Sequence, residues 1–373
     1  MAIRTIVVDD SIVFRKAVRD SLAKIKDVEV ISIAKDGLSA VQKIKRYKPD
    51  LVTLDVEMPG LDGLQVLLAL RDAGIQTTVI MVSSHTERGA SVTTQALNNG
   101  AFDFVLKPSH DDPRANAKEL HSQLQQRIAV LHQRPSSSVA ASPSLTARKI
   151  STLKPTTEVD TRPKSRCRRP SDRLEAIVIG ISTGGPKALR TLIPELPANL
   201  SVPVMIVQHM PPIFTRTMAE DLDRISHVNV VEGVNGSPIE PGTVYIAPGG
   251  KQMRVSKTGP KCQIEVNDAP AVNNCKPSVD YLFESAAIHY GRSVLGIVMT
   301  GMGSDGTAGS ELIAKQGGCV WAQNEATCTV YGMPRRVIES DLADDILSLD
   351  QIQNGIIRLG TNTASSAQCG ALA

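Results

Sequence analysis

The sequence predicts two α/β domains, each built around a largely parallel sheet, joined by a segment without a core of its own. Three observations predict this class. The chain has 373 residues, which suits two domains of about 150 residues each. Short apolar runs alternate with amphipathic stretches in both halves. A stretch rich in Ser, Thr, Pro and basic residues separates the halves.

Five short runs in the first half have the composition of strands that are buried on both faces. They are rich in Val, Ile and Thr and are apolar almost throughout. Helical patterns lie between them, for example at 11–25 and 64–74, and a last helix is expected from about 115 to 131. Regular alternation of strand and helix indicates a parallel sheet with helices on both sides. The expected strands are 3–9, 28–34, 50–56, 77–83 and 102–107.

The segment 123–172 is predicted to be a flexible linker. It carries ten Lys and Arg residues against three acidic ones, so the positive charge of the chain, +3 in total, is concentrated here and the remainder is slightly acidic. Its periodic apolar content is low, and such a segment cannot bury enough surface to offset the entropy of ordering. Its basic end could instead bind nucleic acid or direct nuclear import, and this alternative stays open.

The second half repeats the pattern of strands and helices from about residue 174. We therefore expect a first domain over 1–122, the linker over 123–172, a second domain over 173–361 and a disordered tail over 362–373. The second domain is expected to be doubly wound and mostly parallel. Its expected strands are 175–181, 203–209, 243–249, 262–268, 294–301 and 317–323.

The cysteines and the N-terminus indicate a reducing compartment. The 6 cysteines are scattered without a C-x-x-C pair, so neither a zinc site nor a disulfide framework is suggested. Free thiols persist in the cytoplasm. The N-terminus enters a strand at once without a signal-peptide core, and no run reaches the roughly 20 apolar residues of a membrane span. We expect a cytoplasmic protein.

Acidic and basic side chains stand at the ends of three strands in the first half. Asp9 and Asp10 end the first strand, Asp55 ends the third, and Lys107 ends the fifth. Carboxyl ends of parallel strands lie at one edge of the sheet, so these groups should converge. Clustered carboxylates call for a hard cation such as Mg²⁺, and Asp55 could attack a phosphoryl group. Alternatively, Asp9 and Asp10 cap the next helix and Asp55 lies in a turn.

Around these residues the chain resembles the receiver domain of two-component response regulators, over about residues 3–120. The resemblance implies a flavodoxin-like (βα)5 fold with Asp55 as the phosphoacceptor. It implies that Ser83 and Lys107 contact the phosphoryl group and that Phe104 changes rotamer between states. Mg²⁺ would be held by Asp9 or Asp10 together with Asp55 and the backbone carbonyl of Glu57. The matching stretches are VVDD (7–10), TLDVEMPGLDGL (53–64), MVSS (81–84) and DFVLKP (103–108).

The stretch VIGISTGGP (178–186) contains the first candidate catalytic residue of the second domain. It contains the G-x-S-x-G pattern of a nucleophile elbow around Ser182. Pro186 suits the first position of a helix, and backbone N–H groups at that helix start could stabilise an oxyanion. Glycine-rich turns of this kind also bind phosphates or serve only as turns, so the motif by itself leaves three alternatives.

A nucleophilic serine needs a base and an orienting acid. Of the 7 histidines, only His209 directly ends a strand of the second domain, and Asp305 lies in a glycine-rich loop after another strand. Both should therefore lie at the same edge of the sheet as Ser182. The chain order Ser, His, acid differs from the Ser, acid, His order of α/β-hydrolases. A buried structural histidine and a turn-forming Asp-Gly remain the alternatives for these two residues.

The second half resembles the catalytic domain of chemotaxis protein-glutamate methylesterases, the CheB family. Two departures are visible. Ile181 stands where Ala is usual, and Cys275-Lys276 stand where His-Arg is common. The matching stretches are GISTGGP (180–186), QHMPPIFT (208–215), YIAPGGKQM (245–253), PSVDYLF (277–283), TGMGSDGTAG (300–309) and AQNEATCTVYGMP (322–334).

The second resemblance implies hydrolysis of glutamate γ-methyl esters of chemoreceptors, with release of methanol, and deamidation of specific receptor glutamines. Ser182 would be the nucleophile, His209 the base and Asp305 the orienting acid. The Met302 backbone N–H would bind the oxyanion, and Thr183 would be a neighbouring polar contact. No cofactor is expected for the ester reaction, and Mg²⁺ belongs to the receiver.

The implied partners are methylated chemoreceptors as substrate and a histidine kinase as phosphodonor, with no nucleic acid and no insertion into the membrane. The unphosphorylated receiver would restrict access to Ser182, and phosphorylation of Asp55 would favour an open form. A DNA-binding response regulator would need a helix-turn-helix output, which is not visible after the linker. A non-catalytic scaffold whose serine loop binds phosphate is the other alternative.

Overall fold

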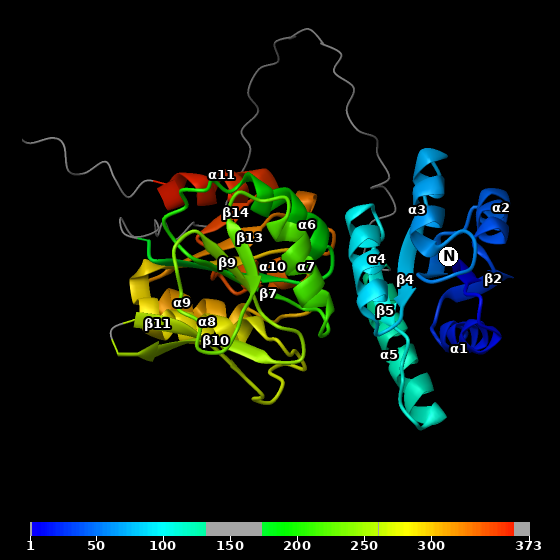
Figure 1. Cartoon of the computed structure of the whole chain (residues 1–373), viewed down its shortest axis with the longest axis horizontal. Coiled ribbons are helices and arrows are strands. Elements are labelled where there is room, and N and C mark those ends of the chain that lie inside the picture. Colours follow the sequence, from blue (N-terminus) through cyan, green and yellow to red (C-terminus); the bar gives the residue numbers. More distant parts are fainter. Residues whose placement is uncertain (1, 132–173, 260, 362–373) are drawn as a thin grey trace, which may run out of the picture.

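The computed structural model describes residues 2–131, 174–259 and 261–361, which form two α/β domains (Figure 1). Most of the expected linker and the expected tail, 362–373, lie outside the described residues.

The N-terminal domain has one parallel five-stranded sheet in the order β2-β1-β3-β4-β5. All five expected strands are confirmed. The order is that of a flavodoxin-like sheet, in which the switch point lies between β1 and β3. The elements are β1 (Ile3–Val8), α1 (Ile12–Leu22), β2 (Val28–Ala34), α2 (Gly37–Tyr47), β3 (Leu51–Asp55), α3 (Gly63–Asp72), β4 (Thr78–Ser83), α4 (Glu87–Asn98), β5 (Asp103–Leu106) and α5 (Pro113–Leu131).

The domain boundary expected after residue 122 is wrong. Helix α5 continues without a break to Leu131, as the helical pattern to 131 predicted. Leu124 and Ile128 lie fully buried against the sheet together with residues of α1. This apolar face extends the core past residue 122, so the receiver includes the whole helix. The low hydrophobic content that predicted a linker begins only after it.

The C-terminal domain has a seven-stranded sheet in the order β14-β13-β12-β6-β7-β9-β8, in which every pair of neighbours is parallel. The chain winds from β6 outward in both directions, so the switch point lies between β6 and β12. The strands are β6 (Ala176–Ile181), β7 (Val204–Gln208), β8 (Asn229–Glu232), β9 (Thr243–Ile246), β12 (Val294–Val298), β13 (Cys319–Gln323) and β14 (Asp345–Leu347).

The six expected strands of this half are confirmed, but one of them lies outside the main sheet. β11 (Lys261–Asn267) pairs with β10 (Gln252–Thr258) as a separate antiparallel hairpin. The sequence prediction missed β8, β10 and β14. β8 and β14 are short strands at the two edges of the sheet, where half-exposed residues do not form an apolar run.

Helices cover both faces of the seven-stranded sheet. Alternate residues of β6 point to opposite faces and enter two different apolar clusters, as the period of a strand requires. The first face carries α6 (Gly185–Leu192), α7 (Phe214–Asp223) and α11 (Leu349–Thr361). The second carries α8 (Val279–Tyr290), α9 (Thr307–Lys315), α10 (Met333–Glu339) and the β10–β11 hairpin.

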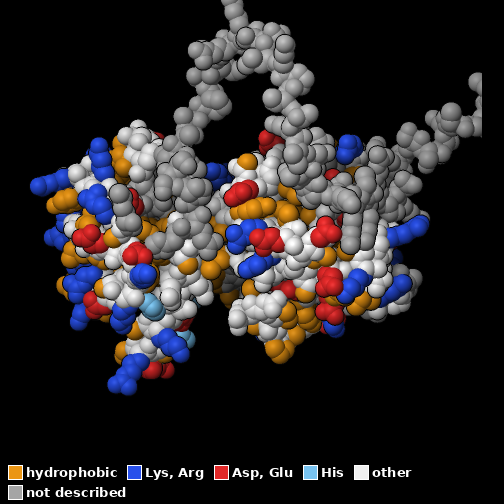
Figure 2. Space-filling view, turned by 180° about the vertical axis from the view of Figure 1, so that it is seen from behind, with side chains coloured by type: hydrophobic (Ala, Val, Ile, Leu, Met, Phe, Trp, Pro, Cys, Tyr) orange, Lys and Arg blue, Asp and Glu red, His pale blue; other side chains and the backbone are white. Residues whose placement is uncertain are grey.

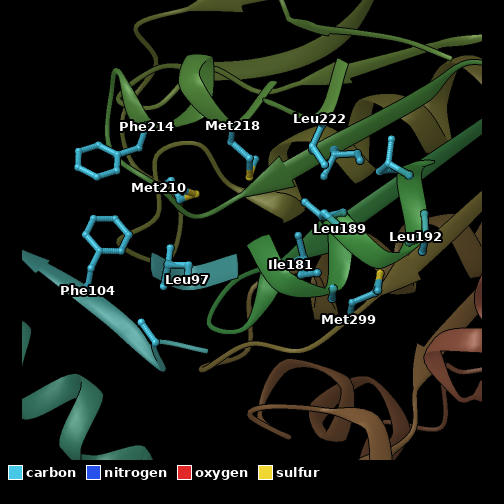
Figure 3. Close-up of a cluster of buried hydrophobic side chains, with 14 of the residues drawn as sticks. Leu97, Phe104, Ile181, Leu189, Leu192, Met210, Phe214, Met218, Leu222 and Met299 are labelled. Atoms are coloured by element: carbon cyan, nitrogen blue, oxygen red, sulfur yellow. The ribbon is translucent and has the colours of Figure 1, made fainter. Parts of the chain in front are cut away.

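The two domains meet through the α4–β5 face of the receiver, which lies against α6 and α7 (Figure 1). Leu97 and Phe104 of the receiver face Met210 and Phe214 of the second domain in one continuous apolar cluster (Figure 3). The rings of Phe104 and Phe214 stack with their centroids 4.7 Å apart and an interplanar angle of 13°. Aromatic stacking of this kind adds about 0.5–1.5 kcal/mol to the burial of the rings.

The surface seen in Figure 2 carries Lys and Arg side chains interspersed with Asp and Glu over both domains. On the described part of that face, no continuous basic stripe of the kind that tracks a phosphate backbone is formed. Among the helices that the structure describes, none combines the length and the apolar character needed to cross a membrane.

We predict that Phe283→Ala lowers the free energy of unfolding of the C-terminal domain by roughly 3–5 kcal/mol, because it leaves a cavity in the core. Phe283 on α8 is fully buried. The single tryptophan, Trp321, is buried on β13 and reports this domain in urea titrations. Ile288→Ala on the same helix is the control, because Ile288 is 65% exposed and should cost at most about 0.5 kcal/mol. Equal costs for the two variants would contradict the assigned core.

Candidate active site

Ser182 lies in a tight turn between β6 and α6. Gly184 has φ +81°, a conformation that a side chain disfavours, and α6 begins directly after it with Pro186 in its first turn. A Cβ on Gly185 would lie 1.8 Å from Gln208 Oε1, so a larger residue would have to displace the buried glutamine whose amide donates to the Ser182 carbonyl. The glycines of the motif therefore provide clearance for the turn that presents Ser182.

The turn lies at the switch point of the sheet, where the loop after β12 faces it. The Ser182 backbone N–H donates to the Thr300 carbonyl at 2.9 Å. A Cβ on Gly301 would lie 2.8 Å from Ser182 Cβ, so the glycine lets this loop pass close to the serine. Ligands of doubly wound sheets bind at such switch points, outside the carboxyl ends of the strands.

His209 directly follows β7, the neighbour of β6 on the other side. Its backbone N–H donates to the Ile181 carbonyl at 3.2 Å, which places it next to the serine turn. Its ring Nε2 lies 2.8 Å from Asp305 Oδ2. Across the described residues no hydrogen bond joins Ser182 Oγ to the His209 ring. The structure therefore brings all three predicted residues to one edge of the sheet, with the His–Asp bond formed and the Ser–His bond open.

Asp305 is buried, and the first turn of α8 satisfies its carboxylate. Ser278 Oγ and the Asp280 N–H donate to Oδ1 at 2.9 and 3.0 Å, and the Val279 N–H donates to Oδ2 at 2.8 Å. Burial raises the pKa of this carboxyl, but the hydrogen bond and charge of His209 and the backbone donors outweigh burial and lower the pKa below its ordinary value. The group is therefore an anion at neutral pH.

The anion changes the protonation of His209. Burial of the ring lowers its pKa, but the hydrogen bond to Asp305 and the neighbouring Cys275 outweigh burial and raise the pKa to about 9. The imidazolium form is thus favoured in the free protein at neutral pH. Only the neutral ring can accept a proton, so the fraction of competent base grows as the pH approaches 9.

Two predicted neighbours of the serine also lie at this edge. Thr183 follows Ser182, and Met302 lies in the loop after β12 with 38% of its surface exposed. Among the described residues, neither the Thr183 N–H nor the Met302 N–H has an acceptor. The Thr183 hydroxyl instead donates to Asp103 Oδ2 of the receiver at 2.8 Å. The side chain that was expected to be a neighbouring polar contact of the serine therefore binds the other domain.

Three further residues lie at this edge without a role predicted from the sequence, namely Ser278, Asp280 and Cys275. Asp280 is buried beside Asp305 and accepts from the Gly306 and Gly309 N–H groups at 2.9 and 2.7 Å. Burial and the nearby Asp305 raise its pKa to about 6. A polar pair, Ser and Asp, at the start of an apolar helix was the one signal in the sequence that could have suggested a support for the active site.

In the receiver, three of the four predicted strand-end groups interact directly. Lys107 Nζ lies 2.8 Å from Asp55 Oδ2 and 3.1 Å from Asp9 Oδ2, and both carboxylates are buried. Asp10 is exposed, but its carboxylate still lies within 4.8 Å of those of Asp9 and Asp55. Helix α1 is capped by Ser11, whose hydroxyl accepts from the Phe14 N–H, so the alternative that Asp9 or Asp10 serves as its N-cap is wrong.

Burial is the main cause of the altered protonation at this site. It raises the pKa of Asp55 to about 6 together with repulsion from Asp9, against the lowering effect of Lys107. Burial also raises the pKa of Asp9. Burial lowers the pKa of Lys107, but its hydrogen bond to Asp55 outweighs this and raises it. Lys107 therefore offsets part of the negative charge that Asp9 and Asp55 bring to the site.

The remaining predicted receiver residues surround Asp55. Ser83 at the end of β4 is buried, and its hydroxyl lies 2.8 Å from Thr93 Oγ1 on α4. The Glu57 N–H donates to Asp55 Oδ1 at 3.4 Å. Phe104 on β5 is 5% exposed because it stacks on Phe214 of the other domain. It therefore points to the domain interface rather than to solvent.

The acidic cluster fits a hard divalent cation. Three carboxylates converge, and Asp9 Oδ2 is buried without a hydrogen-bond partner among the described residues despite its contact with Lys107. Such an oxygen has lone pairs free for a metal, and Mg²⁺ takes oxygen ligands of this kind.

The other described histidines are exposed or, for His121, half-buried beside Ser21, as expected of residues without a part in either site.

Comparison with known proteins finds two family models. Residues 177–356 match the model for CheB methylesterase, and residues 5–118 match the model for the response regulator receiver domain. A protein-glutamate methylesterase/protein-glutamine glutaminase of Desulfotalea psychrophila is 41% identical over 95% of this chain and 98% of its own. One of Nocardioides sp. is 42% identical over 99% of both chains. The crystal structure of the Thermotoga maritima CheB methylesterase catalytic domain is 40% identical, covers 50% of this chain and 98% of its own, and has a TM-score of 0.49.

We predict that Asp305→Asn lowers the pKa of His209 from about 9 by at least ~1 unit, because it removes a charged partner and leaves the ring buried. The titration of the ring protons by NMR measures this directly. His227→Gln is the control: it removes the resonance of an exposed histidine and should leave the titration of His209 unchanged. An unchanged pKa of His209 in Asp305→Asn would show that the carboxylate does not hold the imidazolium.

Proposed function

The chain belongs to the family of CheB methylesterases that carry a response regulator receiver domain, and we propose that it hydrolyses glutamate γ-methyl esters of chemoreceptors. The observation that carries the proposal is the convergence of Ser182, His209 and Asp305 at the switch point of one sheet. Nucleophile, base and orienting acid in this arrangement are the parts of acyl-transfer catalysis.

The reaction runs in two half-reactions. Ser182 Oγ attacks the ester carbonyl carbon while His209 accepts the hydroxyl proton, and the proton then passes to the departing methoxide, which leaves as methanol. Water next attacks the glutamyl-serine ester with His209 again as base, which frees the glutamate carboxylate and restores the serine. Asp305 stabilises the imidazolium in both half-reactions. The open Ser–His distance closes when substrate is bound, as is common for apo sites.

The developing oxyanion is stabilised by backbone donors. The N–H of the residue after the nucleophile, Thr183, and that of Met302 lie in the two loops that meet at the switch point, and neither has an acceptor among the residues described. One such donor contributes about 2.7–4 kcal/mol to transition-state stabilisation. The same site deamidates glutamine when the departing amide nitrogen takes the proton from His209 and leaves as ammonia, as the departing methoxide oxygen takes it and leaves as methanol.

The receiver accepts a phosphoryl group on Asp55 from a histidine kinase. The carboxylate oxygen of Asp55 attacks phosphorus, and the imidazole of the kinase leaves. Asp9, Asp10, Asp55 and the Glu57 carbonyl would hold Mg²⁺, which when bound offsets the charge of the carboxylates and the phosphoryl group. Lys107 and Ser83 provide an ammonium and a hydroxyl for the phosphoryl oxygens.

Regulation follows from the contacts between the domains. The Ser83 hydroxyl accepts from Thr93 of α4 at 2.8 Å and donates to the Ser84 carbonyl at 3.3 Å. If Ser83 donates to a phosphoryl oxygen instead of Ser84, its hydroxyl turns and the contact with α4 changes with it. Helix α4 packs against α6 and α7, and Phe104 on β5 stacks on Phe214 of α7. Asp103, next to Phe104, holds the hydroxyl of Thr183 beside the nucleophile. Phosphorylation therefore favours a rotamer of Phe104 and a position of α4 that release the serine turn.

The partners proposed are methylated chemoreceptors and their histidine kinase, and the location proposed is the cytoplasm. These follow from the activity rather than from a contact surface. The proposed activity involves neither nucleic acid nor insertion into a membrane.

Ser182→Ala should lower methanol release from methylated receptor membranes by roughly 10⁴-fold or more, because the nucleophile acts together with its base. The mutant should keep its urea midpoint. Ser340→Ala, an exposed serine of the same domain, is the matched control and should retain full activity. Full retention of methanol release in Ser182→Ala would defeat the hydrolase proposal in favour of a binding role for the loop.

Asp103→Ala should raise methanol release without a phosphodonor by about fivefold, because one lost hydrogen bond of ~1 kcal/mol weakens the closed arrangement. The residue contacts Thr183 from the receiver and lies outside the phosphoryl site. Asp72→Ala, an exposed carboxylate at the end of α3, is the control and should change nothing. Inhibition by the receiver would be ruled out if Asp103→Ala and deletion of residues 1–170 both left the rate unchanged or lower.

A further inference from the structure

A thiol lies beside the His–Asp pair of the candidate active site. Cys275 Sγ, a ring nitrogen of His209 and a carboxylate oxygen of Asp305 all lie within 4.8 Å of one another. Cys275 is half-buried and forms no disulfide. The hydrolytic mechanism gives this thiol no part, although it faces the base on which that mechanism depends.

The backbone holds Cys275 firmly in this position. It closes a tight turn in which the Cys275 N–H donates to the Val272 carbonyl at 2.8 Å and the Val272 N–H donates back to the Cys275 carbonyl at 3.1 Å. The Gln252 amide donates to the same carbonyl at 3.2 Å. The thiol is therefore presented by a scaffold rather than by a free loop, which is what a preorganised site requires.

The same support connects the thiol to the carboxylate. Asn273, inside the turn, donates to Asp280 Oδ2 at 2.7 Å. The backbone N–H of Asp280 in turn donates to Asp305 Oδ1 at 3.0 Å. One short polar chain thus links the turn of Cys275, the first turn of α8 and Asp305. The three potential ligands come from three segments whose relative positions are set together.

Sulfur, nitrogen and oxygen donors in one group are the ligand set of a zinc-type ion. Zn²⁺ binds Cys, His and Asp at about 2.0–2.3 Å in tetrahedral geometry, and open sites keep three protein ligands and one exchangeable position. Hard ions such as Mg²⁺ prefer oxygen ligands, as in the receiver cluster. The His209 side chain is 17% exposed, so the group can be reached from solvent.

We propose that Cys275, His209 and Asp305 form a site for a thiophilic divalent cation of the zinc type, and that the bound ion switches off hydrolysis. The inhibitory half rests on the proposed function, whereas binding does not. An imidazole with a metal on one ring nitrogen keeps its proton on the other, so the ring has no lone pair left to accept the proton of Ser182. Binding therefore removes the base without moving it.

Protons must leave when the ion binds. The thiol gives up one proton and the protonated ring gives up another, since the ligands are a thiolate and a neutral imidazole. Binding should therefore strengthen as the pH rises. This dependence has the same direction as that of the base in hydrolysis, so inhibition is compared at one fixed pH.

The test uses the full chain with excess Mg²⁺, which occupies the oxygen ligands of the receiver. Co²⁺ is titrated as a spectroscopic substitute for zinc, and the thiolate-to-cobalt charge-transfer band is recorded. Zn²⁺ is then titrated against methanol release. We expect the band and the inhibition in the natural chain and in the control Cys262→Ser, which removes another half-buried thiol of the same domain. In Cys275→Ser the band should disappear and the inhibitory Zn²⁺ concentration should rise at least about tenfold.

The outcomes separate the two proposals. Absence of the band from the natural chain, or its retention in Cys275→Ser, overturns the metal site. A band that depends on Cys275 without any effect of Zn²⁺ on methanol release overturns the switch. A band in Ser182→Ala equal to that of the natural chain supports binding independently of catalysis. A band that depends on Cys275, with no hydrolysis in any sample, supports the metal site and counts against the proposed function.

Discussion

The buried carboxylate of Asp305 is the interaction on which the candidate active site depends. An unpaired carboxylate in this position would cost several kcal/mol, so the fold has to supply donors for it. The first turn of α8 provides backbone N–H groups and the hydroxyl of Ser278, and His209 provides the remaining partner. The carboxylate is thereby kept ionised and directed at the ring, and in the proposed mechanism it stabilises the imidazolium that acyl transfer creates.

In both domains the candidate functional residues lie at the switch point of a parallel sheet, where the order of the strands reverses. In the receiver this brings Asp9 and Asp55 together at the ends of β1 and β3. In the second domain it brings Ser182 and Asp305 to the ends of β6 and β12. The α4–β5 face of the receiver then touches the serine turn itself through Asp103 and Thr183. Only α4 and β5 therefore lie between the residues around Asp55 and the serine turn.

The turn that carries Cys275 adds a second kind of chemistry to the same support. Asn273 in this turn donates to the Asp280 carboxylate of α8, and the Asp280 N–H donates to Asp305. The first turn of α8 therefore helps to position both Asp305 and the thiol. In the two proposals, metal binding and hydrolysis compete for the ring of His209. Cys275, where the family commonly has His, is therefore part of this supported turn and not an isolated substitution.

The sequence by itself determined the fold class, eleven of the strands, and the groups at the strand ends. Apolar runs of strand length and glycines at tight turns are local signals, and in a parallel sheet a residue at a strand end has its place decided by topology. The helical pattern to residue 131 already spoke against a domain boundary at 122, whereas only the tertiary structure decided that Phe104 stacks on Phe214. Only it revealed that Asp280 and Cys275 lie beside the His–Asp pair. These depend on contacts between segments far apart in the chain, and no local pattern of residues encodes such a distance.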